Sequence, residues 1–403
     1  MKFICSLCVL LFLLTNCKQT ETVIPKQTFA DDLNFLKKYH KDLIVLGDSM
    51  GAQVIITPAY QARVMTSTTS GKTGKSFGWI NYDLIRSGKI EKHINAFGGE
   101  ERFWLGPEGG QFGLYFPKDS SFTFNNWQVP AALDTEPFQV KHIYRDSALF
   151  TRELSIKNYS GTSFDLSISR TIKMIDKNGL LSNFGLTELP EDISFAGFET
   201  INKITNQGKL AWTKETGLLS IWILSMLNAT PHGIVAVPYR EGSIDSLGPV
   251  VTDDYFGKVP SDRLKAEAGL LIFKADAKYR SKIGVSGKRA QPWIASYEPQ
   301  EGILTIAQFT LGREGSEYLN SQWGIQKSPF TGDAVNAYND GPNDTGNQLG
   351  QFYELESSSP GAMLESGDSL IHIHRTFHFT GSASGLEKLF KNITGHNLSA
   401  VKF

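Results

Sequence analysis

The chain has 403 residues and a net charge of −1, with 40 basic residues against 41 acidic ones. This balance, without any basic run, lacks the positive surface that nucleic acid needs, so nucleic acid is not expected as a partner. All three cysteines, Cys5, Cys8 and Cys17, lie near the N-terminus. The remainder of the chain therefore has no thiolate for catalysis or metal binding and no disulfide.

The N-terminus has the pattern of an export signal. Lys2 precedes an apolar run at residues 3–14. This run is shorter than the roughly 20 residues of a membrane-spanning helix, so residues 1–16 are predicted to be a signal peptide. The run ends in LTNC, which resembles the lipobox of bacterial lipoproteins and implies that Cys17 is acylated, with residues 17–28 as lipid anchor and tether. An ordinary secretory signal with an incidental cysteine is the alternative.

The residue after the anchor bears on location. Position 18 is Lys rather than the Asp that commonly retains bacterial lipoproteins at the inner membrane. The lipoprotein resemblance therefore implies a cell-envelope protein, with the outer membrane preferred. No other segment of the sequence reaches spanning length, so lipid is the only expected contact with the membrane.

The first element after the tether is predicted to be a helix. Thr28 is a good cap residue, and the following ADDLNFLKKYH places Asp31 and Asp32 in the first turn. Lys37 and Lys38 fall in the last turn, where positive charge complements the helix dipole. We expect this helix to pack on the body of the protein.

From residue 43 onward the sequence is typical of a β protein. Its strand-like runs are rich in β-branched and aromatic residues and end at Gly, Asn, Asp or Pro. These runs are LIVLGD, QVIITPAYQARVMTST, GQFGLYF, LFTRELSIKNY, FDLSISRTIKMID, LLSIWILSML, HGIVAVPY, GLLIFKADAK, GILTIAQFTL, QFYELES and SLIHIHRTFHFTG. Internal repeats, βαβ alternation and nucleotide-binding motifs are absent from the sequence. We therefore predict an all-β fold, a large antiparallel β-sandwich with a short N-terminal helix, as a single domain over residues 29–403.

Several motifs resemble the galactose-mutarotase-like, or aldose 1-epimerase-like, superfamily. In FYELESSSPGAMLESGDSLIHIHRTFHFTG, Leu355-Glu356 is followed by Pro360, a Leu-x-x-Gly-Asp turn and an aromatic closing strand, as in that superfamily. PAYQARVMTST and GGEERFWLGPEGG resemble its early strand and its Arg-bearing loop. With DYFGKVPSDRL, KYRSKIGVSGKRA and NAYNDGPND, the chain resembles a family of exported bacterial lipoproteins of unassigned function. The resemblance implies a β-supersandwich with a concave saccharide site, in which Glu356 matches the general base.

Strand alternation places two carboxylates side by side in QFYELES. Glu354 and Glu356 fall on one face with Phe352, whereas Tyr353 and Leu355 fall on the other. Their Cα atoms are about 6–7 Å apart from the rise of a strand. Mutual repulsion is expected to raise one pKa toward neutrality, which suits acid–base catalysis. A solvated outer face of an edge strand is the alternative.

The closing strand SLIHIHRTFHF places His372, His374 and His378 on one face. Neutral imidazoles can contact sugar hydroxyls, which makes His372 a candidate for substrate binding and His374 a candidate for catalysis. They could also ligate a transition metal together with a carboxylate such as Glu356. The alternative is a set of ordinary hydrogen-bonded histidines on a half-buried sheet.

The glycine-rich segment FGGEERFWLGPEGGQ, residues 97–111, combines the groups that a sugar site uses. Arg102 offers a planar donor fork, Trp104 a flat face for a pyranose ring, and Glu108 an acceptor for hydroxyl protons. Trp127 in FNNWQVP is a candidate second platform. The alternative is a buried structural cation–π pair of Arg102 and Trp104, with Trp127 in the core.

The loop NAYNDGPNDTGNQ is rich in oxygen ligands. Asn339, Asp340, Asn343 and Asp344 make it a candidate for Ca²⁺, which prefers six to eight oxygens, although the spacing is not that of an EF-hand. A plain loop of Asx-turns, whose side chains bond their own backbone, is the alternative. No other cofactor is expected.

One part of the superfamily pattern is missing from this sequence. Epimerases of the superfamily use a His general acid in an Asn-His-x-Tyr-Phe-like segment of a mid-chain strand. FETINKITNQGKLAWTKETG lies at about the expected place and has no His. The acid could come from His142, also a candidate substrate contact, from His374, or from no residue of the chain. Ring opening needs an acid and a base together, so mutarotase activity requires that one of these groups replace the missing His.

Two functions from different classes follow from these patterns. The first is an envelope enzyme that isomerises, epimerises or cleaves a saccharide, with Glu356 as base and Arg102 orienting the substrate. The second is a non-catalytic glycan-binding lipoprotein that uses Trp104 and Trp127. A saccharide or glycan is the expected partner in both, and a monomer is expected.

Overall fold

The structure is a computed structural model that describes residues 28–48, 50–343 and 345–403. The predicted signal peptide, Cys17 and the tether up to residue 27 lie outside the described residues. Within the part that is described, none of the helices combines the length and the apolar character needed to cross a bilayer.

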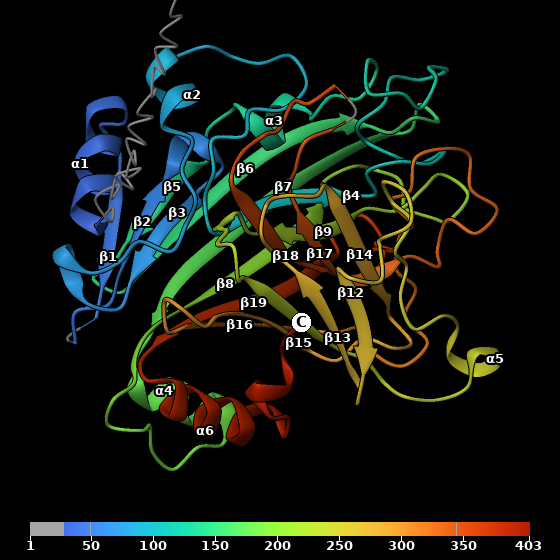
Figure 1. Ribbon diagram of the computed structural model, residues 1–403. Helices are drawn as coiled ribbons and strands as arrows, with labels where there is room; N and C mark the ends of the chain where they lie inside the picture. The colour runs from blue at the N-terminus through green and yellow to red at the C-terminus, as the bar shows by residue number, and fades with distance from the viewer. Residues whose placement is uncertain (1–27, 49, 344) are drawn as a thin grey trace, which may run out of the picture.

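The described chain is built mainly of strands, with a few short helices (Figure 1). The strands are β1 (Ile44–Gly47), β2 (Gln53–Thr57), β3 (Arg63–Thr68), β4 (Arg102–Gly106), β5 (Gln139–Ile143), β6 (Ser147–Lys157), β7 (Ser163–Ile175), β8 (Ser194–Asn206), β9 (Ser220–Leu224), β10 (Leu227–Asn228), β11 (Ile234–Pro238), β12 (Leu264–Glu267), β13 (Leu270–Lys274), β14 (Ser281–Ser286), β15 (Trp293–Glu298), β16 (Ile303–Phe309), β17 (Asp333–Asn339), β18 (Phe352–Ser358) and β19 (Ser369–Thr380). The helices are α1 (Phe29–Tyr39), α2 (Tyr82–Ser87), α3 (Ala131–Asp134), α4 (Lys177–Phe184), α5 (Ile244–Leu247) and α6 (Ala383–Thr394), with 3₁₀ turns η1 (Pro58–Tyr60), η2 (Gly71–Thr73) and η3 (Leu398–Ala400).

Two large sheets dominate the architecture. A ten-stranded sheet has the order β12-β13-β11-β15-β16-β19-β8-β7-β6-β5, and a six-stranded sheet has the order β14-β17-β18-β9-β4 with β10 pairing β18. A three-stranded sheet, β1-β2-β3, precedes them. The strand pairs in the described residues are antiparallel, for example β18 with β17 and β19 with β8. The predicted all-β antiparallel sandwich is confirmed.

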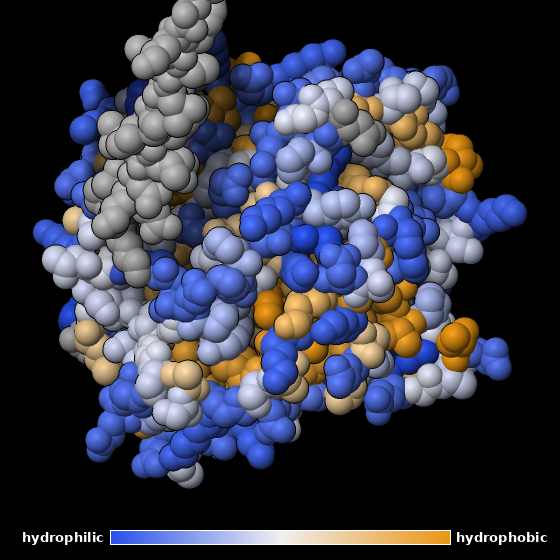
Figure 2. All heavy atoms as spheres, viewed as in Figure 1, coloured by the Kyte–Doolittle hydropathy of each residue, from blue (hydrophilic) through white to orange (hydrophobic). Residues whose placement is uncertain are grey.

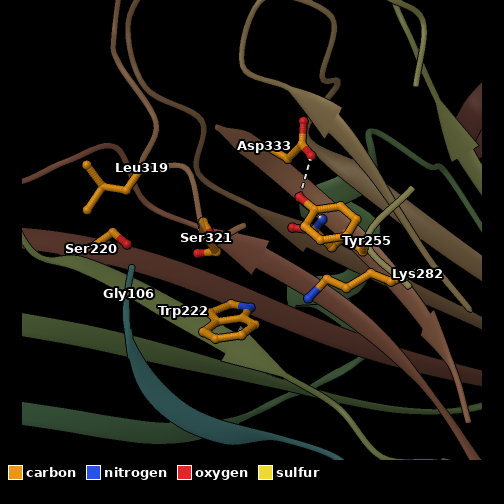
Figure 3. Close-up of a pocket in the computed structure, with 10 residues that line it drawn as sticks. Gly106, Ser220, Trp222, Tyr255, Lys282, Leu319, Ser321 and Asp333 are labelled. Carbon is orange, nitrogen blue, oxygen red and sulfur yellow. Dashed lines mark hydrogen bonds between the residues drawn. The ribbon is translucent and has the colours of Figure 1, made fainter. Parts of the chain in front are cut away.

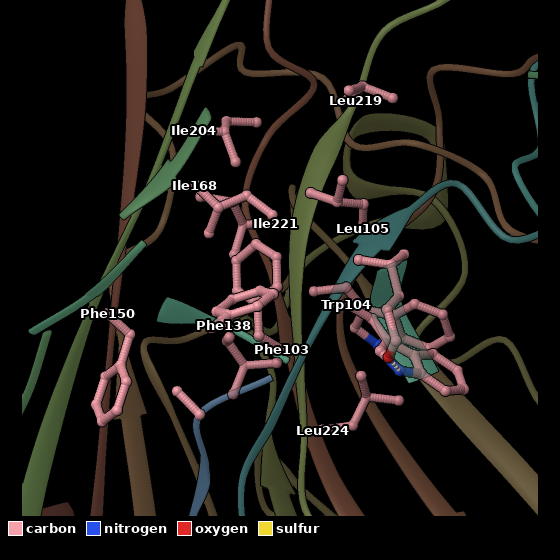
Figure 4. Packing of buried hydrophobic residues seen from close by; sticks show 14 of the residues in the cluster. Phe103, Trp104, Leu105, Phe138, Phe150, Ile168, Ile204, Leu219, Ile221 and Leu224 are labelled. Carbon is pink, nitrogen blue, oxygen red and sulfur yellow. Dashed lines mark hydrogen bonds between the residues drawn. The ribbon is translucent and has the colours of Figure 1, made fainter. Parts of the chain in front are cut away.

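The core lies between the two large sheets because their strands alternate in burial. In β7 the inward positions are Phe164, Leu166, Ile168, Arg170, Ile172 and Met174, all of them buried. From the six-stranded sheet, Phe103 and Ile221 join the same cluster (Figure 4). Figure 4 shows Phe103 and Trp104 on opposite sides of β4, as the period of two requires.

One inward position of β7 carries a charge instead of an apolar side chain. Arg170 is fully buried and its Nη2 donates to Glu101 Oε1 at 2.8 Å. Its other nitrogens donate to Ala62 O at 3.2 Å and Asn202 Oδ1 at 2.6 Å. The guanidinium therefore ties the segment before β3 and the segment before β4 to the ten-stranded sheet.

Helix α1 forms as the sequence predicts. Thr28 is the N-cap and makes a reciprocal capping box with Asp31, which satisfies free N–H groups of the first turn. Leu33 and Leu36 are buried against the three-stranded sheet and α2. Tyr39, in contrast, is 40% exposed.

Further helices are present that the sequence reading did not include. Helix α6 buries Leu386, Leu389 and Phe390, and with α4 it packs over Phe377 and Phe379 of β19. The odd-numbered residues of β19 thus face these helices, while the even-numbered histidines face the core. Figure 2 shows hydrophilic side chains over most of this view, and hydrophobic ones gathered where Figure 1 draws β12, β13 and β15.

The buried carboxyl of Glu298, at the end of β15, is expected to make the stability of the protein depend on pH. Burial raises the pKa of this carboxyl to about 7, although the hydrogen bond that Thr230 donates to it lowers the pKa. The folded state therefore holds a proton that the unfolded state releases above its ordinary pKa of 4.5. As pH rises from 4.5 toward 7, the wild type should lose up to about 3 kcal/mol of unfolding free energy relative to Glu298→Gln. Urea unfolding of both proteins at pH 5 and pH 8 measures this difference, and equal pH slopes would contradict it.

Candidate functional site

The candidate site lies on the face of the six-stranded sheet that points away from the ten-stranded sheet. Glu354 and Glu356 share this face of β18, as alternation predicts, because Tyr353 and Ser357 contact the ten-stranded sheet instead. Arg102 of β4 joins them through β9, since Arg102 and Glu356 are both register partners of Leu224. Two predicted site residues that lie far apart in the sequence are thus brought together.

Arg102 and Glu354 are joined by a buried, charge-assisted hydrogen bond. Arg102 Nη2 donates to Glu354 Oε1 at 2.7 Å, and the two residues are 3% and 5% exposed. Burial raises the pKa of Glu354 to about 8, the nearby charge of Glu356 adds to the rise, and the Arg102 guanidinium opposes it. Glu354 therefore carries a proton through much of the neutral pH range.

Glu356 accepts hydrogen bonds from two residues that the sequence reading did not single out. Lys282 Nζ of β14 donates to Glu356 Oε2 at 2.8 Å, and Trp222 Nε1 of β9 donates to the same oxygen at 2.9 Å. The second oxygen, Oε1, is buried and has no hydrogen-bond partner among the described residues. Glu356 thus accepts two hydrogen bonds at Oε2, while Oε1 is available to accept a hydrogen bond or a proton from a ligand.

Glu108 completes a cluster of three carboxylates and two cations. Its Oε1 accepts a hydrogen bond from Trp323 Nε1 at 3.0 Å, and burial raises its pKa although the charge of Lys282 opposes the rise. Burial lowers the pKa of Lys282, but the charges of Glu356 and Glu108 outweigh it, so its pKa is raised. The cluster thus places the cationic side chains of Arg102 and Lys282 among three carboxyl groups.

A small cavity lies beside this cluster (Figure 3). Trp222, Lys282 and Tyr255 line it together with Ser321 and Asp333. Its volume is about 10 Å³, close to what a single water molecule needs. The site is therefore closed in this structure, and polar side chains rather than hydrocarbon fill most of it.

Tyr255 closes the cavity through a short chain of hydrogen bonds. Its hydroxyl donates to Asp333 Oδ2 at 2.6 Å and accepts from Asn336 Nδ2 at 3.2 Å. Burial raises the pKa of Asp333 to about 6, while the Tyr255 hydrogen bond opposes the rise. Lys282 Nζ lies 5.5 Å from the Tyr255 ring centroid and 4.8 Å from that of Trp222.

The two predicted tryptophan platforms are buried. The Arg102 guanidinium lies 4.3 Å from the Trp104 ring centroid, and Trp104 Nε1 donates to Leu133 O at 3.0 Å. Trp127 stacks with Tyr115 and Trp323 at 6.2 and 6.1 Å between centroids. Trp104 is thus the structural cation–π partner of Arg102 that the sequence left as an alternative, and neither ring offers a free face.

The predicted histidines lie outside this cluster. Ser357 Oγ is 2.8 Å from His372 Nε2 and 2.9 Å from His374 Nδ1, so both rings lie between the sheets, on the opposite face of β18 from Glu356. Burial lowers the pKa of His372 to about 3 and that of His374 well below its usual value. His142 is exposed on β5, the edge strand of the other sheet. The structure therefore brings none of the three to the carboxylates.

The oxygen-rich loop does not gather its side chains at one point. Asn339 bonds Ala277 N and Tyr279 O, whereas Asp340 accepts from Tyr338 and Gly350. Asn343 Oδ1 accepts from the backbone N–H groups of residues 345 and 347, which is the predicted alternative of an Asx-turn. Asp344 lies outside the described residues. Among those described, no group of three or more His, Cys, Asp or Glu side chains is placed to hold a metal ion.

The sequence reading missed the residues that surround Glu356. Lys282, Trp222, Tyr255 and Asp333 come from three strands and a loop. A lysine in the strand SKIGVS and a tryptophan in the apolar run SIWIL look like a solvated and a core residue, respectively. Only the order β14-β17-β18-β9-β4 and the register of these strands reveal the site, and pairing between distant strands is not visible in one sequence.

Three solved structures illustrate what this chain is similar to in fold. A putative aldose 1-epimerase from Escherichia coli K12 has a TM-score of 0.47 and 11% identity, covering 84% of this chain and 99% of its own. A galactose mutarotase-like protein from Lactobacillus casei has a TM-score of 0.47 and 11% identity, covering 84% and 99%. The Slr1438 protein from Synechocystis sp. PCC 6803 has a TM-score of 0.48 and 12% identity, covering 84% and 96%.

The sequence comparisons give a family and no further relative. No curated protein matches the chain. The profile of DUF6786, a family of unknown function, matches residues 27–403. The chain therefore belongs to this family.

Proposed function

We propose that the cluster around Glu356 is a saccharide site that works by acid–base proton transfer. The observation that carries the proposal is the contrast between two adjacent carboxyls. Glu354 holds a proton near neutral pH, whereas Glu356 is an acceptor with Oε1 in reserve. A protonated carboxyl beside a carboxyl oxygen without a hydrogen-bond donor supplies an acid and a base at one place.

In this proposal Glu356 accepts a proton from a substrate hydroxyl while Glu354 delivers one to a substrate oxygen. The two transfers balance, so no net proton is gained or lost, and Glu354 replaces the His acid that the chain lacks in the expected segment. Arg102 lies 2.7 Å from Glu354 and would stabilise the carboxylate left after transfer. The scheme suits epimerisation or ring opening of an aldose, as well as cleavage of a glycosidic bond.

The chemistry of the walls supports a polyhydroxylated ligand. Trp222 and Tyr255 provide aromatic surface, and Asn336 and Ser321 provide neutral hydrogen-bonding groups beside Lys282. A sugar needs this mixture because stacking alone is unselective, while unpaired hydroxyls in a buried site are costly.

A ligand of this size requires the site to open. A cavity of about 10 Å³ cannot contain a pyranose ring. We propose that the loops carrying Tyr255 and Ser321 withdraw to admit the sugar and then close, which excludes water during proton transfer.

The non-catalytic alternative receives less support. Trp104 and Trp127 are 3% and 7% exposed, so neither presents the open platform that a glycan-binding surface needs. We keep as proposals the acylation of Cys17 and the resulting attachment of a monomer to the outer membrane. The acylation rests on the lipobox resemblance, and the outer-membrane location rests on Lys18 as the residue after the anchor.

The test is proton-transfer activity with and without Glu356. NMR exchange between the anomers of reducing hexoses, together with product analysis on an oligosaccharide panel, is measured for wild type, Glu356→Gln and Glu365→Gln. Glu356→Gln is expected to lower the rate about 100- to 10,000-fold, because the base is lost while the shape is kept. Glu365 is an exposed carboxylate in the loop before β19, so its replacement should leave the rate unchanged. Turnover by Glu356→Gln equal to that of the wild type would overturn the proposal.

A further inference from the structure

A second, open groove lies between α1, α2 and the loop before β18. Its volume is about 610 Å³, far larger than the cavity beside Glu356. The residues that line it include Phe35, Trp79, Asn81, Tyr82, Arg86 and Gln351. Three aromatic rings and several hydrogen-bonding side chains thus meet in one concave place that a ring-sized ligand can enter.

The aromatic wall is held in position by packing. The Trp79 ring lies 4.8 Å from the Phe352 ring, and Gly350 packs against its edge. A Cβ at position 350 would come within 2.1 Å of Trp79 Cζ2, so a glycine is required for this close approach. Across the groove, Phe35 meets Tyr82 edge to face at 4.8 Å. The rings are therefore preorganised while remaining partly exposed.

The polar wall is nearly neutral and retains bonding capacity. Asn81 Oδ1 accepts from Leu84 N at the start of α2, and its amide hydrogens have no partner among the described residues. Gln351 is exposed, and within the described part of the chain its side-chain amide bonds Gln348 alone, at 3.3 Å. Arg86 is paired with Asp83 at 2.6 Å, so neither sign of charge is in excess. Such a wall suits neutral hydroxyls better than an anion or a cation.

This groove is separate from the site around Glu356. Phe352, Tyr338 and Met226 are packed together between them and are buried. From Gln351, just before β18, to Glu356 is five steps along the chain, about 16 Å at the rise of a strand. A molecule in the groove would thus not reach the carboxylates through the closed core.

We propose that this groove binds a neutral hexopyranose unit of a saccharide, stacked on Trp79 and hydrogen-bonded by Asn81 and Gln351. The proposed activity of Glu356 does not enter this inference, because the groove has its own walls and its own opening. It would act as a holding site for a glycan chain, with no chemistry of its own.

The test measures the binding of linear α- and β-linked hexose oligomers to the full-length protein by ligand-observed NMR and calorimetry. Trp79→Leu is expected to weaken binding about tenfold or more, because the stacking face is lost. Gln351→Ala should weaken it severalfold, and this exposed residue can be replaced without disturbing the core. Trp293→Leu is the matched control, since Trp293 is a partly exposed tryptophan packed against α6.

Glu356→Gln distinguishes this proposal from the proposed activity. Binding kept in Glu356→Gln and weakened in both groove variants supports a separate saccharide site. Oligomers that bind to neither the wild type nor Glu356→Gln would overturn it, as would affinities that Gln351→Ala and a folded Trp79→Leu leave unchanged. Binding lost only in Glu356→Gln would also overturn it while leaving the first site in place.

Discussion

Replacing Arg170 by Met is expected to lower the free energy of unfolding by about 3–5 kcal/mol, because it leaves Glu101 as a buried charge without its partner. Both side chains are completely buried, and burial already raises the pKa of Glu101 against the pull of Arg170. Denaturant unfolding followed by circular dichroism measures the loss.

Two comparisons make this prediction specific to the buried pair. Arg152→Met removes a similar guanidinium from a partly exposed pair with Glu136, and should cost about 0–1 kcal/mol. Arg170→Met combined with Glu101→Leu should recover part of the loss, because no unpaired charge remains. If Arg170→Met were as stable as the wild type, the interior would tolerate the unpaired Glu101 carboxylate and the prediction would be wrong.

Lys282→Met is the second change with a large expected effect, again a loss of about 3–5 kcal/mol in the free energy of unfolding. Lys282 is 7% exposed and Glu356 is fully buried, so the variant leaves the Glu356 carboxylate with Trp222 as its remaining donor. The double variant Lys282→Met/Glu356→Gln removes both charges and should be more stable than Lys282→Met alone.

Lys258→Met is the control for this ion pair. Lys258 bonds Asp253 at 2.7 Å, but its side chain is 77% exposed, so its loss should cost about 0–1 kcal/mol. Urea unfolding of the wild type, Lys282→Met, Glu356→Gln and the double variant gives the coupling energy between Lys282 and Glu356. A coupling energy near zero would mean that Lys282 and Glu356 do not stabilise each other as an ion pair.

The parts of the fold that the sequence predicted are those set by local rules. Thr28 and Asp31 define the start of α1 through capping, and alternation in β18 correctly places Glu354 and Glu356 together. The strand predicted at residues 110–116 is wrong. Turns replace it, because Gly110 has a φ of +83° and Gly113 N bonds Gly110 O, which bends the chain.

Other elements were missed because tertiary contacts define them. Strand β8 mixes Asn, Lys and Thr with apolar residues, yet its inward Thr200 and Asn202 are buried and bonded to one another. Helix α6 does carry a readable signal, with Ser382 as its cap and Leu386, Leu389 and Phe390 spaced along one face. The histidine face of β19 was predicted correctly as a face, but only the packing of the two sheets decides that it points inward.

The start of β4 connects two chemically different compartments through Glu101, just before the strand, and Arg102, its first residue. Glu101 reaches the interior guanidinium of Arg170, while its neighbour Arg102 reaches the outer carboxylate of Glu354. Inserting or deleting one codon here would exchange the two compartments, since a shift of one position turns every side chain of a strand over. Length variation in this part of the gene should therefore be confined to the loops, and libraries that sample insertions should return almost no functional clones between residues 101 and 106.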